Sequence, residues 1–367
     1  MNRIFNFSAG PCTLPLGALE QARDEMVDYH GQGMSIIEMN HRSKTYVAIH
    51  NEAMSLVKEL LGLPDNYHVM LLGGGATLQF SMVPMNLLHG GKSCDFTHSG
   101  AWAKKALADT KIVGKVNLLF DGTDSNFTTL PDPASLKPSA DATYLHLTSN
   151  ETIGGVQWQD WPDTGDVPIV ADMSSDFLSR HIPVEKFGLI YAGAQKNVGP
   201  AGMAVVIIRQ DMLDACSPDL TNYLSYPNHV KAGSMLNTPP VFTIYMMKLV
   251  LERLRDAGGL GVAEQAAKKR SDLLYDVIES LSSFYRSPVD AACRSQTNVV
   301  FRLPTEELEK QFVAEADAKG MSGLKGHRSV GGCRASIYNA MPIQGAEALA
   351  SFMTQFAKQH GKTKTEF

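Results

Sequence analysis

The chain has 367 residues and a formal net charge of −5, and 44% of its residues are hydrophobic. This length suits two domains, and the slightly acidic balance argues against nucleic acid or an anionic membrane surface as the main partner, so we expect small-molecule ligands. Five singly scattered cysteines predict neither a disulfide framework nor a metal site, and no apolar run reaches signal-peptide or membrane-spanning length, so we expect a cytoplasmic location.

Through its first two thirds the chain alternates an apolar run, a loop rich in small polar residues, and an amphipathic stretch. The predicted strands are 68–72, 92–96, 116–120, 143–148, 168–171, 189–192 and 203–208. Because several runs are continuously apolar, we predict an α/β fold with a mostly parallel central sheet covered by helices on both faces. Ligands bind at the carboxyl ends of such strands, so the polar residues that follow them are the first site candidates.

The last third favours a smaller α+β domain. A helix over 239–258, between a proline pair and a glycine pair, is predicted to join the two domains. It is followed by predicted helices at 261–281, after 305 and at 345–358, and by strands at 299–303 and 334–338. We predict a large domain over 15–257, a small domain over 258–361 with the segment 1–14 packed against it, and a flexible tail over 362–367.

Three glycines, Gly73 to Gly75, directly follow a predicted strand and precede a helical pattern. Backbone N–H groups at such a helix start form an anion-binding site, although a tight turn without a ligand remains the alternative. The spacing matches neither the dinucleotide-binding fingerprint nor the lysine-bearing phosphate loop, so nucleotide binding is not favoured.

Two ionisable residues follow buried strands. Lys196 lies on a turn between two apolar runs, where burial lowers the pKa of an amine and frees it to attack a carbonyl; the alternative is a solvent-exposed loop lysine. Asp172 ends another apolar run, where a carboxylate needs a cation such as a pyridinium N–H; a helix cap or solvated acid is its alternative.

Together with Trp102, these features resemble the fold-type I pyridoxal-phosphate enzymes, the PLP-dependent transferase fold. More closely, the chain resembles the phosphoserine aminotransferases of the class V family over nearly its whole length. The motifs that carry this resemblance are NHRSK (40–44), GGGA (73–76), HSGAW (98–102), TSNET (148–152), ADMSS (171–175), AQKNVGP (194–200), LNTPP (236–240) and GHRSVGG (326–332).

The resemblance implies one pyridoxal 5'-phosphate per subunit, held as a Schiff base on Lys196, which then moves the substrate α-proton. It further implies that Asp172 pairs with the ring nitrogen, that Trp102 stacks on the ring and that Thr152 bonds the phenolic oxygen. The implied phosphate ligands are Ala76, Thr77 and Gln195, together with Asn237 and Thr238 from a second subunit. The protein is therefore expected to be a homodimer with shared active sites.

The same resemblance implies cationic substrate-binding residues. Arg334 would bind the α-carboxylate, because a guanidinium fork matches two carboxylate oxygens. His41, Arg42, His327 and Arg328 would bind the distal phosphate or carboxylate, whereas each His–Arg pair alone is typical of a solvated surface. Several family members have arginine where this chain has Thr77, so we expect an altered affinity for the cofactor phosphate.

The implied reaction transfers the amino group of L-glutamate to 3-phosphohydroxypyruvate, giving O-phospho-L-serine and 2-oxoglutarate in serine biosynthesis. The 4-phosphohydroxythreonine pair, used in pyridoxine biosynthesis, is a second expected substrate. One alternative keeps the cofactor but makes the chain a lyase or cysteine desulfurase, for which Cys333, beside Arg334, is the thiol considered. Another is a binding or scaffold protein without catalysis.

Overall fold

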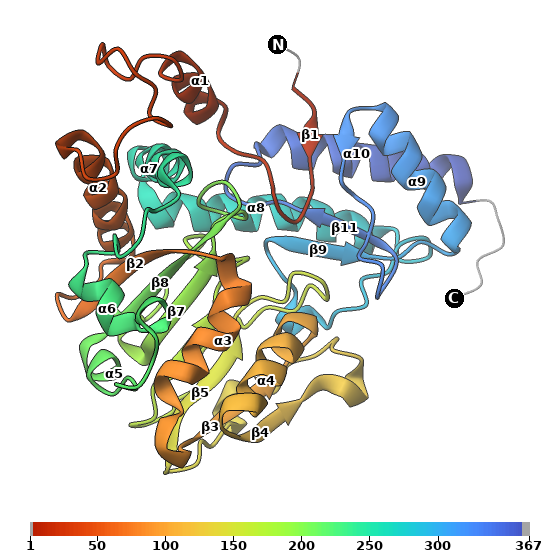
Figure 1. Cartoon of the computed structure of the whole chain (residues 1–367). Coiled ribbons are helices and arrows are strands. Elements are labelled where there is room, and N and C mark those ends of the chain that lie inside the picture. The colour runs from red at the N-terminus through yellow and green to blue at the C-terminus, as the bar shows by residue number, and fades with distance from the viewer. Residues whose placement is uncertain (1–2, 362–367) are drawn as a thin grey trace.

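The computed structural model describes residues 3–361 (Figure 1). The strands are β1 (Phe5–Asn6), β2 (Tyr67–Gly73), β3 (Ser93–His98), β4 (Lys115–Asp121), β5 (Ala142–Thr148), β6 (Ile169–Asp172), β7 (Phe187–Gly193), β8 (Met203–Arg209), β9 (Asn298–Phe301), β10 (Met321–Ser322) and β11 (Cys333–Ser336). The α-helices are α1 (Leu16–Asp24), α2 (Lys44–Leu61), α3 (Gly75–Leu87), α4 (Ala101–Val113), α5 (Gln210–Asp214), α6 (Tyr226–Lys231), α7 (Val241–Asp256), α8 (Gly259–Ser280), α9 (Glu306–Ala318) and α10 (Ile343–His360).

The central sheet has seven strands in the order β2-β8-β7-β6-β5-β3-β4. The pairings β3–β4, β3–β5, β5–β6 and β6–β7 are parallel, and β8 runs antiparallel to both of its neighbours. The predicted mostly parallel sheet covered by helices is therefore confirmed, and each predicted strand of this sheet ends within two residues of its observed bounds.

The apolar runs are continuous because both faces of the sheet are covered. Val69 and Leu71 point into a core cluster that includes Leu56 of α2 and Met247 of α7. Their neighbours Met70 and Leu72 point to the opposite face, into a cluster with residues of α3 and α4. Figure 1 shows α3 and α4 side by side across one face of the sheet.

A second body of structure lies beside the sheet and has its own core. Helices α8 and α10 pack together, and β9 and β11 form an antiparallel pair. Residues from the start of the chain take part, because β1 pairs in parallel with β10 and Phe7 is buried in this core. Neither β1 nor β10 is predicted from the sequence pattern. The domain limits 15–257 and 258–361 stay a proposal, and the predicted tail, 362–367, lies outside the described residues.

The topology gathers several loops at one edge of the sheet. Since β8 is antiparallel to both β2 and β7, β2 runs in the same direction as the parallel strands. The carboxyl ends of β2, β3, β5, β6 and β7 therefore meet at the same edge, which is where ligands bind in open α/β sheets. Between residues 3 and 361, every helix is too short or too polar to cross a membrane.

Candidate active site

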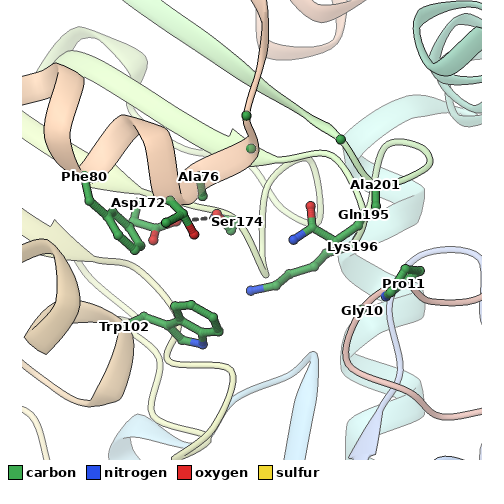
Figure 2. A pocket seen from close by; sticks show the side chains of 14 residues that line it. Gly10, Pro11, Ala76, Phe80, Trp102, Asp172, Ser174, Gln195, Lys196 and Ala201 are labelled. Carbon is green, nitrogen blue, oxygen red and sulfur yellow. Dashed lines mark hydrogen bonds between the residues drawn. The ribbon is translucent and has the colours of Figure 1, made fainter. Parts of the chain in front are cut away.

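A cavity of about 370 Å³ lies at this edge of the sheet (Figure 2). Its lining combines glycine-rich backbone, two aromatic rings, one carboxylate and one amine. The lining residues are Gly10, Pro11, Gly74, Gly75, Ala76, Thr77, Phe80, Trp102, Asp172, Ser174, Gln195, Lys196, Ala201 and Gly202.

Lys196 lies on the turn between β7 and β8 and reaches into the cavity (Figure 2). It is only 8% exposed, so it is not a solvated loop lysine. Its Nζ donates a hydrogen bond to Thr152 Oγ1 at 2.6 Å. Burial lowers the pKa of this amine to about 8, although the nearby Asp172 and Glu151 carboxylates act in the opposite direction. A neutral, nucleophilic amine is therefore accessible near neutral pH.

Asp172 is the last residue of β6 and is 4% exposed. Its Oδ1 accepts a hydrogen bond from the Ser174 N–H at 2.9 Å. Burial raises the pKa of this carboxyl, and the positive charge of Lys196 opposes that rise. A carboxylate held in such a place is well suited to pair with a cationic group that enters the cavity.

Trp102 lies in the first turn of α4, and its indole lines the cavity opposite Asp172 (Figure 2). The Lys196 Nζ is 5.4 Å from the centre of the indole ring. The indole Nε1 is buried and has no hydrogen-bond partner among residues 3–361. The ring thus forms a flat apolar wall on which a second aromatic ring can stack.

The first turn of α3 forms the anion-binding part of the cavity. Gly74, the N-cap residue, has a φ of 96° and supplies no capping side chain. A Cβ at this position would lie 2.7 Å from Leu78 Cδ2, so the tight approach of the chain requires glycine. The backbone N–H groups of Ala76 and Thr77 are left to bind an anion, and Gln195 lines the same space.

Cationic side chains gather around a neighbouring loop. Arg334, on β11, donates from Nη1 to the Thr152 carbonyl at 3.2 Å, and its buried Nε has no partner within the described part of the chain. Burial lowers the pKa of His327, as do the positive charges of Arg334, Arg328 and Lys105. The charges of Arg334, Arg328 and Lys105 therefore all act at the position of His327.

Lys105 was missed by the sequence analysis. Its Nζ lies 4.1 Å from the centre of the Trp102 ring, because residues three apart share one face of a helix. That spacing from Trp102 was the only signal in the sequence. Glu151 was missed as well, since it acts through contacts between segments that are distant in the chain. Ser174, whose N–H donates to Asp172 two residues before it, was also missed.

The remaining predicted residues do not line the cavity within this chain. His41 and Arg42 precede α2, and Asn237 and Thr238 lie in the loop before α7, where both are exposed. His327 and Arg328 line a different hollow, beside α9. The structure therefore brings together Lys196, Asp172, Trp102, Ala76, Thr77 and Gln195 around the cavity, with Thr152 and Arg334 bonded at its side.

The sequence matches the aminotransferase class-V family over residues 4–349. The chain belongs to this family. It is 51% identical to the phosphoserine aminotransferase of Laribacter hongkongensis, over 98% of this chain and 99% of the relative. The solved phosphoserine aminotransferase from Bacillus circulans subsp. alkalophilus matches with a TM-score of 0.96 and 49% identity, over 98% of this chain and 99% of that one. The PLP-bound phosphoserine aminotransferase from Trichomonas vaginalis matches with a TM-score of 0.88 and 36% identity, over 96% of this chain and all of that one, 100%.

Family membership makes this chain a pyridoxal-phosphate-dependent aminotransferase. The cavity has the chemistry that this cofactor needs. The first turn of α3 suits the phosphate, the Asp172 carboxylate suits a pyridinium nitrogen, and the Lys196 amine suits an aldehyde. The flat wall formed by Trp102 fits the ring between them.

Proposed function

We propose that this aminotransferase moves the amino group of L-glutamate to 3-phosphohydroxypyruvate, which gives O-phospho-L-serine and 2-oxoglutarate. The observation that carries the proposal is the agreement, at about half identity over nearly the full length, with relatives named phosphoserine aminotransferase. The reaction belongs to serine biosynthesis, and we expect it to take place in the cytoplasm.

Lys196 is the proposed catalytic residue. Bound pyridoxal phosphate supplies an electron sink for the carbanion that forms when the substrate loses its α-proton. Lys196 would hold the cofactor through its amine, and the same amine, when free, would take the α-proton of the substrate as a general base. Its pKa of about 8 allows both the protonated and the neutral form near neutral pH. Thr152, which accepts its hydrogen bond, keeps the amine on one side of the cavity.

Asp172 and Trp102 have supporting roles in the proposal. The Asp172 carboxylate keeps a proton on the ring nitrogen, because releasing that proton would leave a buried charge without a partner. Trp102 covers one face of the ring and excludes water from it. Ala76, Thr77 and Gln195 bind the phosphate, and Thr77 supplies no cation there. Losing one charge-assisted phosphate contact costs about 1.5 to 3 kcal/mol of binding free energy if nothing replaces it.

Substrate choice is proposed to depend on charge. Arg334 binds the α-carboxylate through the part of its guanidinium that does not contact Thr152. His327 and Arg328 bind the distal anionic group, supported by Lys105, which acts on His327 electrostatically. Because the same cations accept any phosphorylated amino acid of similar length, we propose the 4-phosphohydroxythreonine pair of pyridoxine biosynthesis as a second substrate.

A second subunit completes the proposed site. His41, Arg42, Asn237 and Thr238 do not line the cavity of their own chain, yet they lie in motifs shared with the family. We infer a homodimer in which these four residues reach the partner's cavity.

The cysteine chemistry of the chain disfavours a desulfurase. That reaction needs a thiolate on a mobile segment, whereas Cys333 is fully buried in β11 and burial raises the pKa of its thiol. The Cys12 thiol donates to the Lys196 carbonyl, and burial raises its pKa to about 12. Both thiols are therefore held protonated at neutral pH. A scaffold role is disfavoured because a buried amine and a buried acid face one cavity.

The test is a half-reaction with purified protein and added pyridoxal phosphate. Phosphoserine and glutamate should each convert the bound cofactor to its amine form, whereas aspartate and alanine should do so far more slowly. Lys196→Ala should lose the cofactor bond and nearly all turnover, on the order of 10³-fold. Equal rates with alanine and phosphoserine would overturn the substrate assignment. Unchanged turnover in Lys196→Ala would overturn the assigned role of that residue.

A further inference from the structure

A buried carboxylate that the sequence analysis did not single out contacts the start of α4. Glu151, in the loop after β5, is 0% exposed. Its Oε1 accepts a hydrogen bond from the Ala103 N–H at 2.8 Å, and its Oε2 accepts one from the Trp102 N–H at 3.1 Å. Both carboxylate oxygens thus accept hydrogen bonds from adjacent backbone N–H groups in one helix turn.

Helix α4 lacks the usual means of satisfying those amides. Its N-cap residue is Gly100, which has no side chain to accept a hydrogen bond, and the first turn contains no acidic residue. The first N–H groups of a helix have no intrahelical acceptor, so they need a partner from elsewhere. Glu151, some fifty positions along the chain, provides it. A carboxylate also suits the positive end of the helix dipole.

Gly100 leaves the space that this contact requires. A Cβ at Gly100 would lie 2.5 Å from Glu151 Cδ and 2.8 Å from Oε2. The φ of Gly100 is 164°, which is extended backbone that any residue adopts, so the requirement for glycine is steric and not conformational.

Glu151 is also joined directly to the group that contacts Lys196. The next residue is Thr152, whose hydroxyl accepts the hydrogen bond of the amine. The backbone of Glu151 is held at both ends, since its N–H donates to Val156 O and its carbonyl accepts from Gly155 N–H, each at 2.8 Å. Glu151 therefore connects Trp102, whose N–H bonds its carboxylate, with Thr152, which follows it in the chain.

We propose that Glu151 is a positioning residue of the transaminase site, which holds Trp102 flat against the cofactor ring and keeps a negative charge beside Lys196. This inference rests on the proposed function in one respect, because it takes Trp102 to be the stacking residue. The contact between Glu151 and α4 stands without the cofactor.

The electrostatics of the site support this role. Burial raises the pKa of Glu151 to about 7. The two backbone N–H bonds and the positive charge of Lys196 lower this pKa, and the negative charge of Asp172 raises it. In return, the Glu151 charge raises the pKa of Lys196. Above neutral pH, Glu151 therefore favours a proton on the nitrogen of Lys196.

Glu151→Gln tests the proposal with little change in shape. A glutamine oxygen accepts one of the two N–H bonds, but its NH₂ group faces the other N–H. The matched control is Asp95→Asn, which changes a buried carboxylate of the same domain that accepts the Ser139 N–H and lies near the start of β3, at the opposite edge of the sheet.

Two measurements are made, neither of which is enzyme activity. In the cofactor-free protein, amide hydrogen exchange over residues 100–106 should be about tenfold faster in Glu151→Gln than in the wild type, because one hydrogen bond to a charged acceptor is lost. In the protein with bound pyridoxal phosphate, the midpoint of the absorbance titration above pH 7 should move to lower pH. Asp95→Asn should change neither quantity.

Unchanged exchange and an unchanged titration midpoint in Glu151→Gln would overturn the proposal. Faster exchange with an unchanged midpoint would also overturn it, because Glu151 would then be only a helix cap. If Glu151→Gln does not fold, Gly100→Ala replaces it. The added methyl displaces the carboxylate, so exchange over the same segment should again be faster and the absorbance midpoint should again move to lower pH. Failure of every variant and of the wild type to bind pyridoxal phosphate would contradict the proposed function instead, while the exchange measurement would still test the contact.

Discussion

Lys196 should titrate as an unusually acidic amine when the cofactor is removed. Burial lowers the pKa of this group from 10.5 to about 8. Lowering the pKa from 10.5 to about 8 corresponds to about 3 kcal/mol of lost preference for the charged form. At pH 7 roughly 9% of the amine would be neutral, against about 0.03% for an ordinary lysine, which is an increase of roughly 300-fold.

A change at Asp172 tests whether nearby negative charge raises the pKa of Lys196. The Asp172 carboxylate favours the charged form of Lys196 and is the largest influence that opposes burial. Asp172→Asn removes that negative charge, so the pKa of Lys196 should fall further. Glu151→Gln should act in the same direction.

Trace acetylation of the cofactor-free protein measures these values. Small amounts of acetic anhydride are added between pH 6 and pH 11, and mass spectrometry reports the labelling of each lysine, with the exposed Lys104 as reference. The midpoint for Lys196 should lie near pH 8, and it should be lower in Asp172→Asn. A midpoint above pH 10, or a higher midpoint in Asp172→Asn, would refute the argument from burial and charge.

Two further predictions concern the substrate-binding residues. Mixing Lys196→Ala with Arg42→Ala, each inactive alone, should recover about a quarter of wild-type activity. If Arg42 crosses the interface, about half of the dimers are mixed and each of these has one intact site. No recovery from a proven mixed dimer would contradict that crossing. Glu309, whose carboxylate accepts bonds from Arg302 and Gly332, holds the loop that carries His327. Glu309→Gln should therefore raise KM for 3-phosphohydroxypyruvate about tenfold with a smaller change in kcat, and the exposed Glu306→Gln should change neither.

The sequence predicted the sheet well because its inner strands are almost entirely buried, whereas the edge strand β4 has only exposed and half-buried residues. A run such as 203–208 is then continuously apolar and cannot be mistaken for a loop. Lys196 and Asp172 could be found for a related reason, since an ionisable residue directly after such a run is rare and lies at the ligand edge. The two-residue strands β1 and β10 gave no comparable pattern, because they are too short to show a period.

Residues that act through tertiary contacts could not be predicted from the sequence. Glu151 lies in a polar motif, and only the fold reveals that its carboxylate takes the place of a missing cap on α4. Lys105 looks like any exposed helical lysine until Trp102 is placed beneath it. His41 and Arg42 are proposed to act in the cavity of a second subunit, and the contacts within one subunit do not place them at a site.

The pairing of β1 with β10 has a consequence for synthesis. Gly10 and Pro11 line the cavity, and the segment that carries them is anchored when Phe5 pairs with Met321. During translation β1 therefore cannot pair until β10, some three hundred residues later, has been synthesised. The cofactor pocket cannot be completed before Met321 has emerged and paired with Phe5, so pyridoxal phosphate is expected to bind only after that point of synthesis.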